Sequence, residues 1–179
     1  MVQSAEQINN IKTLFSDSNG NIWLGTFSAG IWVNSPGERN FRQLPYLVNN
    51  RPGVYSFAQE NEKMWIATFG NGLHSYNTLT GETEHFMPHS GDTTSLSNSM
   101  VRTLLLDSRG NLWIGTMNGL NLKTAGSNTF RRFQAGNAYD PLTINHNEIF
   151  YIQEDREGNI WIGTGGGGLN KYNPLTERF

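Results

Sequence analysis

The stretch Asn111-Leu112-Trp113-Ile114-Gly115-Thr116, which follows Asp107-Ser108-Arg109-Gly110, decides the fold of this chain of 179 residues. Close copies of the ten-residue string occupy 17–26 and 155–164, and a degraded copy, Met64-Trp65-Ile66-Ala67-Thr68, lies between the first two. The tryptophans stand at 23, 65, 113 and 161, so successive copies are 42, 48 and 48 residues apart. A regular period of this length indicates stacked structural units.

Each unit divides into four predicted strands. The first strands are expected at 11–15, 54–58, 101–106 and 149–153, and the repeated string supplies the second, as at 112–116. Third strands are expected at 72–77 and 168–173, and fourth strands around Phe86 and at 130–133. Polar connections lead from unit to unit at 44–52, 88–100 and 135–148.

The turn before each second strand has a local cause. Asp at the first position of a type I turn accepts backbone N–H groups, and Gly three residues later adopts positive φ. We therefore interpret the recurring pairs as turn-formers and not as catalytic acids, which would be expected once: Asp17 with Gly20, Asp107 with Gly110, and Asp155 with Gly158. The second unit has Gln59-Glu60-Asn61-Glu62 at this place, which predicts a different and looser turn.

The second strand is apolar on consecutive residues, which indicates burial of both its faces. Its tryptophans, Trp23, Trp65, Trp113 and Trp161, are predicted to be core residues. Gly25, Gly115 and Gly163 share a face with the tryptophans and leave room for a neighbouring sheet, and the second unit has Ala67 there.

Four-stranded units of 40–50 residues with Gly-rich turns and two covered faces predict an all-β fold of β-propeller blades. We expect residues 1–179 to form a partial propeller of four antiparallel blades. Their approximate limits are 8–52, 53–99, 100–147 and 148–179, with the last blade truncated.

Composition narrows the function. The formal charge of −2 and the pI near 6.1 argue against a nucleic-acid partner. The absence of cysteine excludes a thiolate metal site and a Cys nucleophile. No apolar run approaches a membrane span, so this segment is expected to make no membrane contact, and the N-terminus does not resemble a signal peptide.

Neither a metal, a cofactor nor a catalytic site is predicted. The four histidines are His74, His85, His89 and His146, and no third ligand stands at a metal-binding spacing from any pair. The run Gly165–Gly168 lacks the Lys-Ser/Thr of a phosphate loop and precedes a strand, not a helix.

The string Asp-x-x-Gly-Asn-[Ile/Leu]-Trp-[Ile/Leu]-Gly-Thr, followed by Gly-Leu-x-x-Tyr-Asn, resembles the two-component regulator propeller repeat, as does Thr94–Asn98 running into Val101. The resemblance covers 8–179. It implies the periplasmic sensor region of a hybrid histidine kinase that controls glycan utilisation, in which two propellers of about seven blades precede a membrane helix. Four blades would then be an excised fragment of an inner-membrane protein. This fragment is expected not to be an enzyme. The apolar faces of its two terminal blades would favour self-association.

Ligand binding is expected in the loops that differ between units. Loops after second and fourth strands open at the same end of a blade, so we predict an oligosaccharide site for transcriptional regulation there. Its residues would be Phe27, Phe69, Met117, Tyr46, His89, Tyr139 and His146. Other polar residues of the same connections are Asn49, Asn50, Arg51, Asp92, Asp140 and Asn147.

Two other functions stay open. The segment could be a protein-interaction or dimerisation platform, because propellers often serve this way. The Asp-containing turn also resembles the hairpins of sialidases, which would make it a glycosidase. A sialidase needs an Arg cluster, a Tyr nucleophile and an acid, and the arginines here show no convergence in the sequence.

Overall fold

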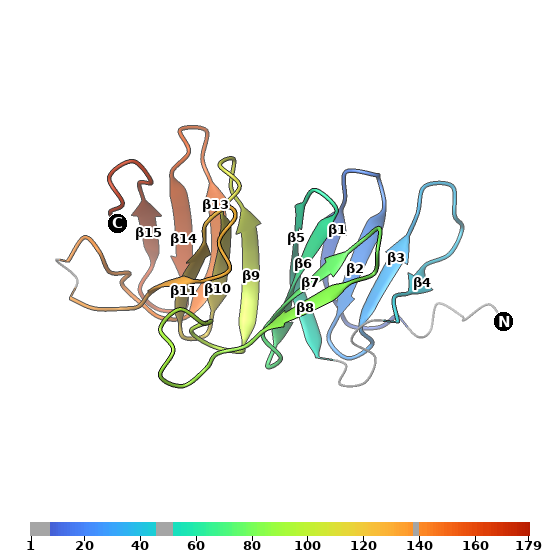
Figure 1. Cartoon of the computed structure of the whole chain (residues 1–179), viewed down its shortest axis with the longest axis horizontal. Helices are drawn as coiled ribbons and strands as arrows, with labels where there is room; N and C mark the ends of the chain where they lie inside the picture. The colour runs from blue at the N-terminus through green and yellow to red at the C-terminus, as the bar shows by residue number, and fades with distance from the viewer. Residues whose placement is uncertain (1–7, 46–51, 138–139) are drawn as a thin grey trace.

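The computed structural model describes residues 8–45, 52–137 and 140–179. These residues form fifteen strands and no helix, arranged in four antiparallel sheets that follow one another along the chain. Figure 1 shows the sheets side by side in a row, with the first sheet and the last sheet at opposite ends of the row. Nothing in the described part therefore resembles a membrane-crossing helix. The prediction of an all-β propeller-blade fold is confirmed.

Strands pair in chain order within each sheet. The first sheet contains β1 (Ile11–Ser16), β2 (Ile22–Thr26), β3 (Ile31–Asn34) and β4 (Arg42–Gln43). The second contains β5 (Gly53–Glu60), β6 (Lys63–Phe69), β7 (Leu73–Asn77) and β8 (Thr83–Phe86). The third contains β9 (Val101–Leu106), β10 (Leu112–Thr116), β11 (Gly119–Lys123) and β12 (Arg131–Phe133).

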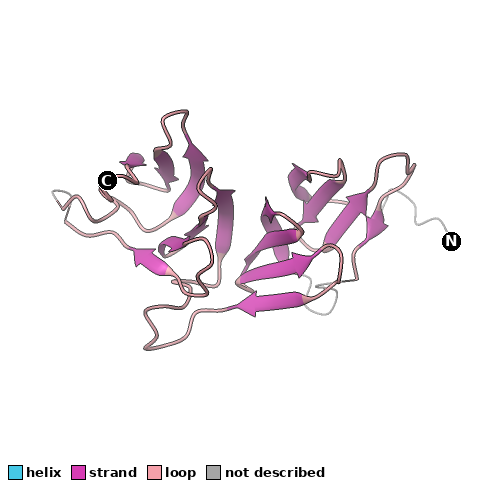
Figure 2. Cartoon of the chain, turned by 45° about the horizontal axis from the view of Figure 1, so that its top comes forward, coloured by secondary structure: helices cyan, strands magenta, loops and turns pink. Residues whose placement is uncertain are grey.

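The fourth sheet has three strands: β13 (Ile149–Glu154), β14 (Ile160–Thr164) and β15 (Leu169–Tyr172). After β15 the chain contributes one isolated bridge, between Asn173 and Arg178, in place of a fourth strand. The first strands of successive sheets contact one another, β1 with β5, β5 with β9, and β9 with β13. These first strands are therefore the inner edge of the row, and the sheets extend outward from them (Figure 2).

The core fills the spaces between neighbouring sheets. Trp23 packs with Val54, Phe57 and Met64 of the second sheet, and Trp113 packs with Ile149 and other residues of the fourth. A Cβ on Gly25 would lie 2.8 Å from Val54 Cγ1, and one on Gly115 would lie 2.7 Å from Ile149 Cγ2. The small residue two places after the tryptophan is thus a socket for a β-branched side chain of the next sheet.

A carboxylate of the preceding turn binds the indole of Trp23, Trp113 and Trp161. The indole Nε1–H donates to Asp Oδ2 six residues earlier, at 2.8 Å in Trp23–Asp17, 2.9 Å in Trp113–Asp107 and 2.7 Å in Trp161–Asp155. Oδ1 of each of these Asp residues also accepts two backbone N–H groups of its turn, as from Asn19 and Asn21. The Asp residues are turn-formers as predicted, and they also hold the indole.

The second sheet holds its tryptophan with a different turn and a different carboxylate. Glu60 pairs with Lys63, so Asn61 and Glu62 form a two-residue loop in which Asn61 has φ of 53°. The prediction of a different turn is confirmed, but the expectation of a looser one is wrong. Asn tolerates the left-handed region that such loops need, and Glu60 Oε2 accepts Trp65 Nε1–H at 2.9 Å in place of the missing Asp.

One core prediction needs correction. Trp23, Trp65 and Trp113 are at most 3% exposed, but Trp161 is only half-buried. The reason is that no sheet of the described chain covers the outer face of the fourth sheet. Tyr151 and Leu169 on that face are 73% and 61% exposed.

Candidate functional site

In the second and third sheets, the loop after the second strand contacts the connection that leads to the next sheet. Gly72 N donates to Ser99 O at 2.8 Å, and Gly119 N donates to Asn147 O at 2.7 Å. The last residues of the connections 88–100 and 135–148 therefore meet these loops.

The threonine that ends each repeated string shapes these loops. Its Oγ1 donates to the carbonyl of the glycine that starts the next strand, at 2.8 Å in Thr26–Gly30 and 2.7 Å in Thr68–Gly72. The same bond measures 2.8 Å in Thr116–Gly119 and 2.9 Å in Thr164–Gly168. Because this hydrogen bond fixes the ends of each loop, the residue after the threonine has a defined place.

Every first strand carries a β-bulge at the same position. In β9, Val101 pairs with Thr116 and Thr103 with Gly115, so Arg102 has no partner in the register. The register skips the equivalent residue in the other three first strands. A bulge re-aims a side chain away from the regular faces of the sheet. We call the four skipped residues the bulge row: Lys12, Tyr55, Arg102 and Phe150.

The bulge row lies against the residues that follow the threonines. Lys12 Nζ is 5.3 Å from the ring centroid of Phe27, and Tyr55 stacks on Phe69 with centroids 5.2 Å apart. Arg102 Nη1 is 3.5 Å from Met117 Sδ. We call this continuous surface the inner rim: the bulge row together with Phe27, Phe69 and Met117.

Arg102 joins three sheets at the rim. Its guanidinium carbon lies 4.2 Å from the ring centroid of Phe150 and 5.9 Å from that of Tyr55. These contacts connect the second, third and fourth sheets. Phe27 and Phe150 remain 46% and 40% exposed, while Tyr55, Phe69, Arg102 and Met117 are half-buried. The rim therefore offers ring surfaces and cations to a ligand on a supported framework.

Phe27, Phe69 and Met117 are thus brought together as the sequence analysis expected. His146 lies beside the glycine loop of the fourth sheet, where a Cβ on Gly166 would be 3.2 Å from its Nε2. Its Nδ1 accepts the Glu148 N–H at 3.1 Å. Tyr46 and Tyr139, with Asn49, Asn50 and Arg51, lie outside the described residues.

His89 and Asp92 do not join the rim. They line a separate pocket of about 200 Å³ with residues of β8 and the segment before β12, including Phe86 and Phe130. The connection starts at an outer strand and crosses to an inner one, so its first residues stay at the periphery. Asn147 serves the framework, because its Oδ1 accepts Ala135 N–H at 2.7 Å.

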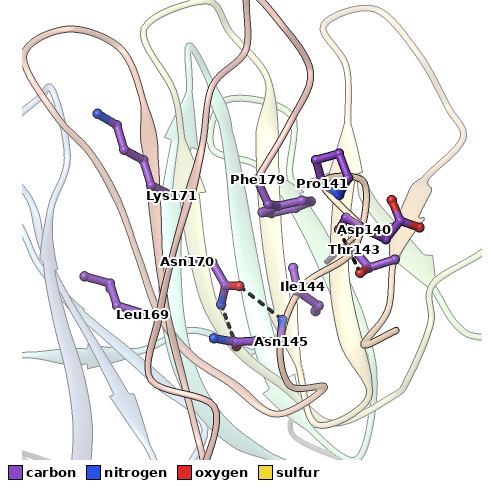
Figure 3. Close-up of a pocket in the computed structure, with 9 residues that line it drawn as sticks. All are labelled: Asp140, Pro141, Thr143, Ile144, Asn145, Leu169, Asn170, Lys171 and Phe179. Carbon is purple, nitrogen blue, oxygen red and sulfur yellow. Dashed lines mark hydrogen bonds between the residues drawn. The ribbon is translucent and has the colours of Figure 1, made fainter. Parts of the chain in front are cut away.

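A larger pocket of about 410 Å³ lies beside β15 (Figure 3). Asp140, Thr143 and Ile144 of the connection form one part of its lining, and Leu169 and Lys171 of β15 form another. Asn145 and Asn170 join the two parts: Asn170 Nδ2 donates to Asn145 Oδ1 at 2.8 Å, and Asn145 N donates to Asn170 Oδ1 at 3.1 Å. Asp140, a polar candidate, lies here and not at the inner rim.

The histidines of the second sheet form a stacked pair. The rings of His74 and His85 are 4.2 Å apart and nearly parallel, and Nε2 of each lies 2.9 Å from Asn71 O. Burial, and then the neighbouring His85, lower the pKa of His74 to about 4. Among the described residues, no group of three or more His, Asp or Glu side chains is placed to hold a metal ion.

The bulge row was missed in the sequence analysis. Its members differ in every unit, so they carry no repeated signal of their own. A signal does exist beside them: each follows a β-branched residue, Ile11, Val54, Val101 or Ile149, at the start of a first strand. A variable residue in an otherwise repeated frame could have identified the row.

Known proteins match this chain in both sequence and structure. Residues 6–28, 95–118 and 143–166 match the family model described as two component regulator propeller. The degraded second unit between 59 and 68 lies outside these segments. A curated relative, histidine kinase P4 of Formosa agariphila, is 32% identical over 107 residues, which cover 56% of this chain and 8% of that protein.

Two of the similar solved structures are extracellular domains. The extracellular domain of a predicted hybrid two-component system of B. thetaiotaomicron has 25% identity and a TM-score of 0.72, covering 95% of this chain and 21% of that one. A second such domain from the same organism has 24% identity and a TM-score of 0.51, covering 99% and 28%, and shows the fold alone. The chain spans less than a third of the length of each of these three relatives.

Proposed function

We propose that this chain, three segments of which match the two component regulator propeller family, is a ligand-sensing segment of the extracytoplasmic region of a hybrid two-component sensor. The proposed ligand is an oligosaccharide, and the proposed outcome is regulation of transcription through a histidine kinase in the same protein. The proposed location is the periplasm. The similarity to extracellular domains of hybrid two-component systems supports the setting.

The inner rim is the observation that carries the proposal. Aromatic rings such as Phe27 and Phe150 can stack on sugar rings, and these two are the exposed aromatic members of the rim. Each is held by a framework element, Phe27 after the Thr26 hydrogen bond and Phe150 by a bulge in β13. Because the rim residues differ from sheet to sheet, the surface is asymmetric, as a specific site requires.

A glycan array with the chain, followed by calorimetry on each hit, tests this proposal. Phe69→Ala removes the partner of Tyr55 in the rim, and we expect it to weaken binding about fivefold, since a stacking interaction contributes about 1 kcal/mol. Leu79→Ala, an exposed residue outside the rim, is the control. If no oligosaccharide binds, or if Phe69→Ala binds as tightly as the parent chain, the proposal fails.

One observation favours a second function, a self-association platform. Ile11 and Leu14 on the first sheet are 47% and 65% exposed, and Tyr151 and Leu169 on the last sheet are 73% and 61% exposed. Large exposed apolar groups on a sheet face mark interaction surfaces. Association that is independent of sugar, measured by sedimentation with and without bound oligosaccharide, would support a platform over a sensor.

We propose no catalysis for this segment. A sialidase-like reaction requires several arginines that converge on a substrate carboxylate. Among the described residues, the contacts of the inner rim involve one arginine, Arg102. Incubation with the oligosaccharides that bind, followed by chromatography of the products, tests this. Any turnover would contradict it.

A further inference from the structure

We propose that the ligand of the inner rim carries an anionic group, a carboxylate or a sulfate ester, and that Arg102 binds it. This inference rests on the proposed ligand-sensing function and names the class of saccharide: acidic and not neutral.

The donors of Arg102 are the first reason. A guanidinium has five N–H donors in a fixed fork. Here Nη1 faces the Met117 thioether, a weak acceptor, and the guanidinium packs on Phe150. In the described part of the chain, the ion pairs are Lys63–Glu84, Arg109–Glu154 and Arg131–Glu177, so Arg102 has no carboxylate partner there. Its fork therefore remains available for bidentate binding of an anion.

The partial burial of Arg102 is the second reason. Removing a cation from water is unfavourable unless other groups compensate. Contacts with the Phe150 and Tyr55 rings supply part of this compensation through cation–π attraction. An anionic ligand would supply the rest. A guanidinium fixed between two rings is also pre-organised, so binding would order little additional side chain.

The charge of the rim is the third reason. The chain has a formal charge of −2, yet the bulge row contains two cations, Lys12 and Arg102, and no acid. Lys12 also lies outside the three ion pairs of the described residues. Glu148 is the acidic side chain beside Phe150, close to Gly165, and it forms no ion pair with either cation in that same part. The rim therefore concentrates positive charge where aromatic rings are available for stacking.

Matched saccharides separate charge from shape. Oligogalacturonate of four units and its fully methyl-esterified form share one backbone and differ in the carboxylates. A κ-carrageenan tetrasaccharide and its desulfated form make the same comparison for sulfate. Calorimetry with the chain should show binding of at least one acidic form about 10- to 100-fold tighter than its neutral partner, because hydrogen bonds to charged groups contribute about that factor. The pair that shows this difference identifies the carboxylate or the sulfate as the source.

Variants then assign the effect to Arg102. Arg102→Gln should reduce the ratio between the affinities for the acidic and the neutral form to about one. Arg102→Lys, which keeps the charge and loses the fork, should retain part of the preference. Arg131→Gln is the control, because that guanidinium lies 4.8 Å from the Phe133 ring on the outer strand β12. Circular dichroism and the unfolding midpoint of each variant show whether it is folded.

Three results would overturn the inference. If the neutral and acidic forms bind equally, the ligand needs no anionic group, and the proposed sensing function still stands. A preference for the acidic form that persists in folded Arg102→Gln would move the anion to another residue. Failure of all four saccharides to bind, together with an empty glycan array, would refute the proposed function itself.

Discussion

Trp113 and Trp161 occupy the same position of the repeat but differ in their surroundings. Trp113 is 1% exposed between two sheets, whereas Trp161 is half-buried on the outer face of the fourth sheet. Trp113→Ala should lower the free energy of unfolding by ~3–5 kcal/mol, the usual loss for a buried large aromatic residue. Trp161→Ala should cost clearly less. Urea unfolding of both variants measures the difference, and equal losses would contradict the packing described above.

The carboxylate that holds Trp161 should make stability depend on pH. Burial would raise the pKa of Asp155, but hydrogen bonds from Trp161, Asn159 and Glu157 lower it to about 2. Since the folded-state pKa lies below the unfolded value of 3.8, the ionised group stabilises the fold above pH 4, and this contribution is lost as the pH falls toward 2. The same hydrogen-bond pattern lowers the pKa of Asp17, although burial opposes it.

Urea midpoints between pH 6 and pH 2 test this dependence. Asp155→Asn should have a lower urea midpoint than the parent chain at pH 6. The difference between the two midpoints should decrease as the pH falls from 4 to 2. Glu157→Gln, in the same turn, is the control. A gap that stays constant with pH would show that the ionised carboxylate is not the source of the difference.

Among the structural elements, the second strand shows how neighbouring sheets fit. A Cβ on Gly115 would lie 2.6 Å from Thr103 Cγ2 and 2.7 Å from Ile149 Cγ2, while one on Gly163 would meet Tyr151 Cβ at an ordinary 3.4 Å. Gly115→Val should therefore destabilise the fold by about 1–3 kcal/mol through overpacking. Gly163→Val should change stability by no more than about 0.5 kcal/mol. Thermal unfolding of the pair tests whether the socket needs a neighbouring sheet.

Strands were easier to predict from the sequence than the rim was. Period and turn chemistry place β10 at 112–116 as expected, because the same residues repeat at the same step. The turn at 59–62 was misjudged because Glu60 reaches the indole of Trp65 from one residue nearer than Asp does. The bulge at Arg102 is a feature of hydrogen-bond register, which has no fixed residue type. His89 lies in the pocket beside β8 and not at the inner rim, because the first residues of its connection follow an outer strand.

At the scale of the whole molecule, the two ends of the row are not alike. The first sheet presents Ile11 and Leu14, and the last presents Tyr151 and Leu169 beside the socket at Gly163. Ile11 occupies the strand position from which Val54 and Ile149 enter the sockets of preceding sheets. Contact between these unlike faces would be head to tail, which gives rings or open assemblies.

We therefore expect the chain to associate as its concentration rises. The double variant Tyr151→Glu and Leu169→Glu should shift the association midpoint to concentrations at least tenfold higher, because it places charge on one of the two faces. Leu79→Glu changes a residue that is 77% exposed in the turn between β7 and β8, and it should have no effect. Sedimentation velocity at several concentrations makes the comparison. Unaltered association of the double variant would exclude this face.

The bulge in each first strand also has an evolutionary consequence. It separates the positions of the repeat that form the strands and the core from the one position whose side chain varies. The side chains at 12, 55, 102 and 150 are Lys, Tyr, Arg and Phe, while the positions just before them keep a β-branched residue, which is buried in the core at Val54, Val101 and Ile149. Four such positions form a row of variable side chains on a constant scaffold. New ligand specificities could then arise by single substitutions within the row, without a change in the packed core of any blade.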